Sequence, residues 1–146
     1  GIQSPWIMPI EGGEPKQIVN AFAGVNSVDV TRDGRRLMFF TSNPQNQFAI
    51  VVCDLPACAN RVDVSLPPKF RYVTTKFTPD GQGYAYVDST GMNVWTRSFK
   101  GGDPRQITQF TDGRIVMALA YSRDGKRLAV ARSTTTNDIV LIKGLK

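Results

Sequence analysis

Residues 95–107 read Trp95-Thr96-Arg97-Ser98-Phe99-Lys100-Gly101-Gly102-Asp103-Pro104-Arg105-Gln106-Ile107, and an earlier segment of the chain repeats this pattern. That segment is Trp6-Ile7-Met8-Pro9-Ile10-Glu11-Gly12-Gly13-Glu14-Pro15-Lys16-Gln17-Ile18, and it aligns without a gap 89 positions upstream. Both copies keep the tryptophan, the Gly-Gly pair, the proline and the final Gln-Ile. Similarity at a fixed offset is typical of a repeat protein.

A second marker gives the length of one repeat unit. An Asp-Gly pair recurs in Thr31-Arg32-Asp33-Gly34, Thr78-Pro79-Asp80-Gly81 and Ser122-Arg123-Asp124-Gly125. Successive aspartates are 47 and 44 positions apart, so the offset of 89 equals two units of about 45 residues. A cysteine-containing loop explains the longer first interval.

Each unit can be divided into four short strands joined by turns. In the second unit, Pro79 fixes φ near about −65° and so excludes a type I′ turn. We expect a type I turn there, with Gly81 in the left-handed conformation. Short strands in a unit of about 45 residues match one blade of a β-propeller. No segment shows the apolar spacing of a helix.

These segments resemble the WD40-like (PD40) repeat of TolB-type β-propellers. That repeat runs roughly as Phe-Ser-Pro-Asp-Gly-Lys, a strand, and a further strand ending in Gly-Gly and Leu-Thr. The resembling segments are Phe77-Thr78-Pro79-Asp80-Gly81, Tyr121-Ser122-Arg123-Asp124-Gly125-Lys126-Arg127-Leu128-Ala129 and Gly101-Gly102-Asp103-Pro104-Arg105-Gln106-Ile107-Thr108. The first unit departs from the pattern, because Thr31-Arg32 replaces Ser-Pro. The resemblance implies a non-catalytic scaffold for protein contacts, as in the C-terminal propeller regions of bacterial signalling proteins. Such repeats also occur in periplasmic proteins and beside peptidase domains.

We therefore predict an all-β fold, a partial β-propeller of four-stranded antiparallel blades that fills residues 1–146. It has about three blades plus two extra N-terminal strands. Counting strands a to d outward from the propeller axis, residues 1–20 supply strands c and d of a preceding blade. Residues 25–66 and 72–109 form whole blades, and residues 115–143 form an incomplete last blade.

This blade count does not close a ring, because known propellers have at least four blades. Either the missing blades lie elsewhere in a longer parent chain, or two copies assemble one six-bladed ring. In the second case each copy lends residues 15–19 to the last blade of its partner. The segment Gly1-Ile2-Gln3-Ser4-Pro5 has no initiator methionine, basic region or apolar run, so we expect a processed fragment without a signal peptide.

Composition and motifs argue against several classes of function. The chain has no histidine, which removes Ser-His-Asp triads, HExxH zinc sites and imidazole switches. No apolar run approaches the roughly 20 residues of a membrane helix. No Gly-x-Ser-x-Gly elbow, phosphate loop or dinucleotide fingerprint is present. We expect no enzyme activity, no cofactor and no bound metal.

The two cysteines, Cys53 and Cys58, flank a proline-containing turn between two strand candidates. Two residues opposite each other in a hairpin are about 4.5–5.5 Å apart at Cα, within the range of a disulfide. Either they form a disulfide, which favours a periplasmic or other extracytoplasmic setting, or they are free thiols in a reducing compartment.

Charged residues suggest one interaction surface. Lys and Arg number 18 against 12 Asp and Glu, a net charge of +6. Antiparallel order brings the a–b and c–d turns to one rim. The basic residues expected there are Arg32, Arg35, Arg36, Arg123, Lys126 and Arg127, with Lys16 and Lys100. Such a rim could steer an acidic partner. Nucleic acid is not expected, because no aromatic residues are interleaved with these bases.

The other candidate residues favour structural roles. One aspartate per blade (Asp33, Asp80, Asp124) suits a turn cap beside Gly34, Gly81 and Gly125, in which the carboxylate accepts a backbone N–H. We expect Val30, Phe77 and Tyr121 to pack between blades, and Trp6 and Trp95 to do the same at equivalent positions. Asp29, Thr74 and Lys76 are candidates for the central channel.

The sequence thus predicts a scaffold for protein–protein interaction or sensing, within a larger bacterial protein. The alternatives are a gating propeller of a peptidase or other hydrolase, and a propeller that binds a carbohydrate or small ligand. The expected partner is another protein.

Overall fold

The computed structural model describes residues 3–19, 24–42, 48–66 and 70–134, whose regular structure is entirely β. In chain order the strands are β1 (Trp6–Ile7), β2 (Lys16–Gln17), β3 (Val25–Val30), β4 (Arg36–Ser42), β5 (Phe48–Asp54), β6 (Ala59–Val64), β7 (Phe70–Phe77), β8 (Gly83–Asp88), β9 (Val94–Ser98), β10 (Arg105–Gln106), β11 (Ile115–Tyr121) and β12 (Leu128–Ser133).

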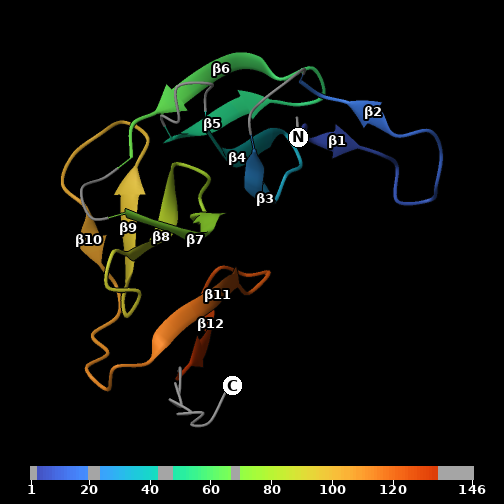
Figure 1. The fold of residues 1–146 in the computed structure, drawn as a ribbon. Helices are drawn as coiled ribbons and strands as arrows, with labels where there is room; N and C mark the ends of the chain where they lie inside the picture. The colour runs from blue at the N-terminus through green and yellow to red at the C-terminus, as the bar shows by residue number, and fades with distance from the viewer. Residues whose placement is uncertain (1–2, 20–23, 43–47, 67–69, 135–146) are drawn as a thin grey trace, which may run out of the picture.

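Two complete four-stranded sheets form the centre of this structure. Each runs in simple order, β3-β4-β5-β6 and β7-β8-β9-β10, with every neighbouring pair antiparallel. The inner strands β3, β7 and β11 contact one another in that order. The sheets fan outward from these strands (Figure 1), so the all-β, partial-propeller prediction is confirmed.

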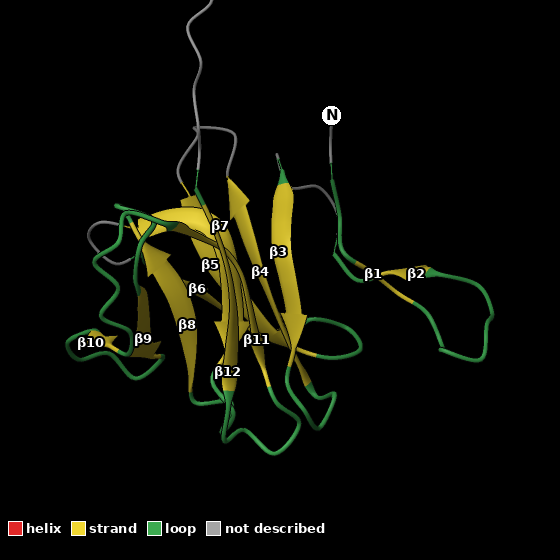
Figure 2. Ribbon diagram, turned by 90° about the horizontal axis from the view of Figure 1, so that it is seen from below, coloured by secondary structure: helices red, strands yellow, loops and turns green. Residues whose placement is uncertain are grey.

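A two-stranded sheet lies at each end of the chain. The pair β11–β12 is antiparallel, and its strand β11 lies against β7. The C-terminal part of the predicted last blade, residues 135–143, lies outside the described residues. The pair β1–β2 extends away from the four-stranded sheets (Figure 2).

The register of β1–β2 matches that of β9–β10. Trp6 lies opposite Gln17 in the first pair, and Trp95 lies opposite Gln106 in the second. The 89-residue repeat in sequence is thus also a repeat in strand pairing. β1 and β2 therefore pair with each other as β9 and β10 do.

Both faces of the middle strands are buried in the second blade, because this blade is packed between the first blade and the β11–β12 pair. In β8, Tyr84 and Tyr86 join a cluster shared with the first blade, whereas Ala85 and Val87 join a cluster shared with β11 and β12. A strand that is buried on both faces has a continuous run of apolar residues, and residues 84–87 (Tyr-Ala-Tyr-Val) form such a run.

All three inner strands carry an irregularity in their pairing with the next strand. The register shifts between Asn26 and Asp29 in β3, between Arg71 and Thr75 in β7, and between Val116 and Ala118 in β11. A bulge bends a strand and increases its twist. In β3 the bulge includes Ser27, which has a φ of 52°.

Two of the expected packing residues are more exposed than their repeat equivalents. Phe77 is buried and Tyr121 is half-buried, but Val30 is 44% exposed. Trp95 packs against the cluster between the first two blades, whereas Trp6 is 59% exposed. Among the described residues, only the short strands β1 and β2 precede the first blade. No complete sheet therefore covers Val30 and Trp6 on that side. The expectation that Val30 and Trp6 pack between blades is therefore wrong for the described structure.

Candidate interaction rim and inter-blade pocket

The second a–b turn is held by a network of hydrogen bonds around Asp80. The Thr78 hydroxyl donates to Asp80 Oδ1 at 2.6 Å, and the backbone N–H of Gln82 donates to the same oxygen at 3.0 Å. The Thr78 oxygen in turn accepts from the Gly83 N–H at 2.9 Å. Gly81 closes the turn with a φ of 67°, a conformation that costs glycine little.

The other two a–b turns repeat this network. Thr31 and Ser122 donate to Asp33 and Asp124 over 2.7 and 2.5 Å. Those carboxylates also accept backbone N–H groups, at 3.1 Å in both turns, from Arg35 and Lys126. We did not predict this role of the Ser or Thr hydroxyl from the sequence, although the residue lies two positions before the aspartate in all three turns.

These hydrogen bonds lower the pKa of the turn carboxyls. For Asp33, Asp80 and Asp124 the main cause is the hydroxyl donor, followed by the backbone N–H, and the pKa lies below the ordinary value of 3.8. The carboxylates are thus ionised at neutral pH and occupied by the turn. The described residues contain no group of three metal-binding side chains.

The three a–b turns lie together at one rim of the structure. The Arg32 guanidinium of the first turn donates to the Ser122 carbonyl of the third turn at 2.7 Å. Arg36 donates to the Gly81 carbonyl of the second turn at 3.0 Å, and its guanidinium lies over the Phe77 and Phe99 rings. Two of the six expected cations of the a–b turns therefore join blades together instead of facing a partner.

The remaining four expected cations of the a–b turns are exposed. The Arg35 side chain is 84% exposed, and its nearest carboxylate contact, to Asp33, is 3.9 Å long. Arg123, Lys126 and Arg127 are exposed around the third turn. We call Arg35, Arg123, Lys126 and Arg127 the basic rim. Its side chains project from turns with a fixed backbone.

The expected channel residues Asp29 and Lys76 contact each other. Lys76 Nζ lies 3.1 Å from Asp29 Oδ1, and the Phe77 N–H donates to Asp29 Oδ2 at 2.7 Å. Nearby, the Thr75 N–H donates to the Ser27 hydroxyl at 2.7 Å. Asp29, Lys76 and the equivalent Ala120 line a small pocket of about 220 Å³ between the inner strands. Its polar groups are used mainly to join the first two blades.

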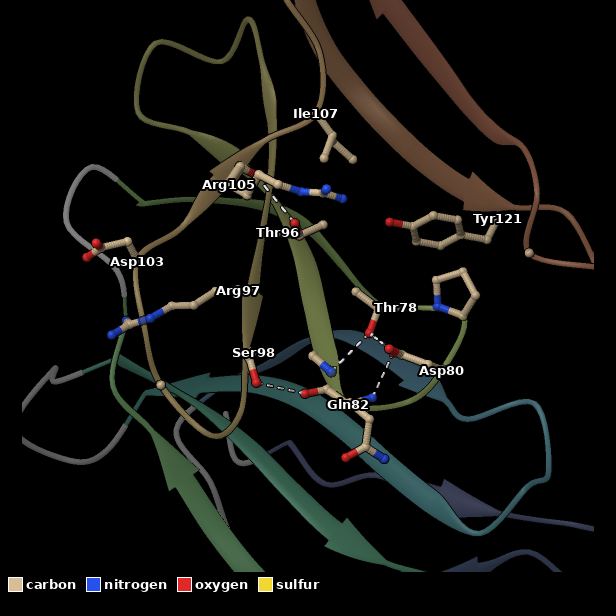
Figure 3. A pocket seen from close by; sticks show the side chains of 14 residues that line it. Thr78, Asp80, Gln82, Thr96, Arg97, Ser98, Asp103, Arg105, Ile107 and Tyr121 are labelled. Atoms are coloured by element: carbon tan, nitrogen blue, oxygen red, sulfur yellow. Dashed lines mark hydrogen bonds between the residues drawn. The ribbon is translucent and has the colours of Figure 1, made fainter.

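A larger pocket, of about 580 Å³, lies where the second and third blades meet at the rim. Its walls include Asp80 from the a–b turn, Thr96 from β9, Arg105 from β10, and Tyr121 from β11. Figure 3 shows the Arg105 guanidinium and the Tyr121 hydroxyl pointing toward one another across this pocket. No pattern in the sequence indicated this pocket, because its residues come from three separate segments of the chain.

The two cysteines are joined. Cys53 and Cys58 form a disulfide across the turn between β5 and β6, with their Cα atoms 4.8 Å apart. Cys53 is buried in the cluster with Leu37, Phe39 and Val51. The disulfide alternative is thus the one that the structure supports. None of the described residues belongs to a helix long and apolar enough to span a membrane.

Comparison with known proteins gives similarity at the level of structure alone. No family model matches the chain, and no curated protein matches it. TolB from Acinetobacter baumannii is similar with a TM-score of 0.70 at 20% sequence identity, and the match covers 92% of this chain and 33% of that one. TolB from Agrobacterium tumefaciens is similar with a TM-score of 0.67 at 15% identity, over 89% of this chain and 46% of that one.

The chain thus spans about a third of the first TolB structure and just under half of the second. At such low identity the match establishes the fold. Together with the four-stranded sheets around the inner strands β3, β7 and β11, it shows that this chain has a TolB-like β-propeller fold, in part.

Proposed function

We propose that this chain is a non-catalytic β-propeller scaffold that binds a protein partner through its basic rim. The observation that carries this proposal is the arrangement of the three a–b turns. Each backbone is fixed by the same aspartate network, and Arg32 and Arg36 tie the turns to one another. The backbone that carries the exposed cations of the rim is therefore held in place, so less conformational entropy is lost when a partner binds.

The parent protein proposed for this scaffold is longer and bacterial, and its remaining blades complete the ring. The partial coverage of both TolB structures supports this, and so does the β1–β2 pair, which corresponds to strands c and d of a blade. A ring made of two copies is the alternative. Light scattering distinguishes the two, because a monomer of 16.1 kDa in solution would contradict the ring of two copies.

The proposed location is outside the cytoplasm, in the periplasm of a bacterium. The Cys53–Cys58 disulfide supports this, because disulfides persist in oxidising compartments. The resemblance to repeats of periplasmic proteins points the same way.

Site-specific photo-crosslinking in the producing cells tests the binding surface. A photoreactive amino acid replaces Lys126 on the basic rim, or Ser89 in the turn between β8 and β9 as a matched exposed control. We expect one discrete protein adduct from position 126 and none from position 89. The adduct should disappear when Arg35 and Arg127 are changed to glutamate. Equal labelling at both positions, or an adduct that survives the charge reversal, would contradict this function.

A second candidate function, binding of a small ligand, is favoured by the pocket between the second and third blades. Its volume of about 580 Å³ is within the usual range of roughly 300–1,000 Å³ for small-molecule sites. Thermal-shift measurements with a panel of sugars test it, and a shift that depends on pocket residues would support it.

A further inference from the structure

Arg105 and Tyr121 present polar groups to the pocket between the second and third blades, and no described residue hydrogen-bonds to either side chain. Arg105 is exposed on β10, and Tyr121 is half-buried at the end of β11. Their polar ends point toward one another from opposite walls (Figure 3). A guanidinium only donates hydrogen bonds, and a phenol hydroxyl can donate one, so an acceptor placed between them would be bonded from both sides.

The acidic residues of the pocket do not supply that acceptor. Asp80 Oδ1 already accepts hydrogen bonds from Thr78 and the Gln82 N–H. The Asp103 side chain points away from the space between Arg105 and Tyr121 (Figure 3). Arg97, the other cation of the pocket wall, also points away from that space. The Arg105 guanidinium thus has no carboxylate partner among the described residues.

Tyr121 keeps its proton at neutral pH. Burial raises the pKa of Tyr121 above its ordinary value of 10.0, and the Arg105 charge acts against this rise. The hydroxyl therefore donates a hydrogen bond to any anion that enters. Because it is partly desolvated, such a bond is stronger than one in open water.

The rest of the pocket suits a ligand that is larger than a single ion. Ile107 and Pro79 give apolar surface next to the two donors. The backbone N–H groups of Gly81 and Gly125 are used inside their own turns, so they are not free to bind a phosphate. One guanidinium and one hydroxyl match the charge and the planar shape of a carboxylate, which arginine binds through two parallel hydrogen bonds.

We propose that this pocket binds a carboxylate side chain of an extended acidic peptide segment, with Arg105 pairing to the carboxylate and Tyr121 donating a hydrogen bond to it. Ile107 and Pro79 contact the apolar residue next to the acidic one. The net charge of +6 and the adjacent basic rim favour a partner rich in Asp and Glu. This inference rests on the proposed function, because it names the chemistry of the protein partner.

Fluorescence anisotropy with a labelled peptide of alternating glutamate and leucine tests this site on the 146-residue chain. A peptide with glutamine in place of glutamate is the control ligand, and glutarate is the free dicarboxylate. We expect saturable binding of the glutamate peptide, no binding of the glutamine peptide, and much weaker competition by glutarate. If glutarate competes as well as the unlabelled peptide does, the site binds free acids and the peptide assignment is wrong.

Variants of the two donors identify the residues. Arg105→Ala should weaken binding of the glutamate peptide about tenfold or more, because a charge-assisted hydrogen bond is lost. Arg105→Lys keeps the charge, and binding should be recovered only in part. Tyr121→Phe keeps the buried ring and should weaken binding several-fold. The matched control is Arg61→Ala, which removes the same charge from the outer strand β6, outside both the pocket and the basic rim, and should change binding less than twofold.

The outcomes separate this inference from the proposed function. If Arg61→Ala weakens peptide binding as much as Arg105→Ala does, only the overall charge matters and the pocket assignment is wrong. If the glutamate peptide does not bind but position 126 still crosslinks to one partner, this inference fails while the proposed function stands. If neither occurs, both fail. Melting curves of each variant show that the fold is retained, and Tyr121→Phe gives a test even if Arg105→Ala unfolds.

Discussion

Asp29 in the first blade accepts a hydrogen bond from the backbone N–H of Phe77 in the second blade, with 2.7 Å between Oδ2 and the nitrogen. Its other carboxylate oxygen lies 3.1 Å from Lys76 Nζ. The Asp29 side chain is only 20% exposed, so the contact is largely shielded from water. One side chain thus satisfies a backbone donor and a cation of the neighbouring blade.

Removal of this carboxylate should loosen the junction between the first two blades. Asp29→Ala leaves the Phe77 N–H without its acceptor, and a buried unsatisfied donor costs about 1–3 kcal/mol. Urea unfolding measures the change. The control is Asp63→Ala, since Asp63 forms an exposed ion pair with Arg61 on the same strand and should cost at most about 1 kcal/mol. Equal losses in both variants would argue against the role given to Asp29.

Acid should remove the stabilisation that the turn carboxylates provide. A carboxyl whose pKa is lower in the folded chain than in the unfolded chain stabilises the fold at higher pH, and this contribution is lost as the pH falls through the folded value. For Asp33, Asp80 and Asp124 the loss occurs below the ordinary pKa of 3.8. The free energy of unfolding should therefore fall steeply below about pH 4.

The triple variant Asp33→Asn, Asp80→Asn and Asp124→Asn should show a shallower fall over the same range. Some slope remains, because the Arg132 hydrogen bond also lowers the pKa of Asp112. Urea unfolding at several pH values measures both slopes, and the neutral exchange Gln82→Ala should leave the slope unchanged. A triple variant with the full slope of the parent would show that the turn networks do not cause it.

The disulfide should be present in the protein purified without reductant, and its reduction should destabilise the fold. Closing a loop with a sequence separation of 5 restricts the unfolded chain by about 2 kcal/mol on the loop-entropy model. Thiol titration should find no reactive thiol before denaturation or after it. Urea unfolding with reductant should lose this stability, whereas a Cys53→Ala, Cys58→Ala double variant should not respond to reductant. Two titratable thiols in the oxidised protein would contradict the disulfide and the proposed compartment together.

The two equivalent tryptophans should differ in their contribution to stability. Trp95 packs between blades and donates its Nε1 hydrogen to Asp88 Oδ2 at 3.3 Å, whereas Trp6 is 59% exposed. Trp95→Ala should cost about 2–4 kcal/mol because it leaves a cavity. Trp6→Ala should cost less than about 1 kcal/mol in this chain. A large loss from Trp6→Ala would mean that the N-terminal pair packs more tightly than the structure shows.

The repeat made much of the fold predictable. The 89-residue offset placed Trp6 and Trp95 at equivalent positions, and both occupy the same place in their strand pairs. The Asp-Gly pairs marked the a–b turns, because a left-handed residue after a type I turn favours glycine. Local signals of this kind depend on the backbone alone, so they can be read from a short window of sequence.

Features that depend on the neighbouring blade could not be predicted. We predicted Arg36 to be an exposed cation of the rim, but its guanidinium lies over the Phe77 and Phe99 rings of the next blade. Arg105 and Tyr121 are 16 positions apart and belong to different blades, so only the packing of these blades brings them to one pocket. The bulges in the inner strands were missed because no proline or paired glycine marks them.

The contact between Arg32 and Ser122 links the first blade directly to the third, past the second. A linear array in which each unit touches only its neighbours can fray from one end and keep the rest intact. Here, detachment of the β11–β12 unit would break the hydrogen bond from Arg32, 90 positions before Ser122, to the Ser122 carbonyl. We therefore expect hydrogen exchange to show that the first blade and the β11–β12 unit open together, and that the β11–β12 unit does not unfold independently.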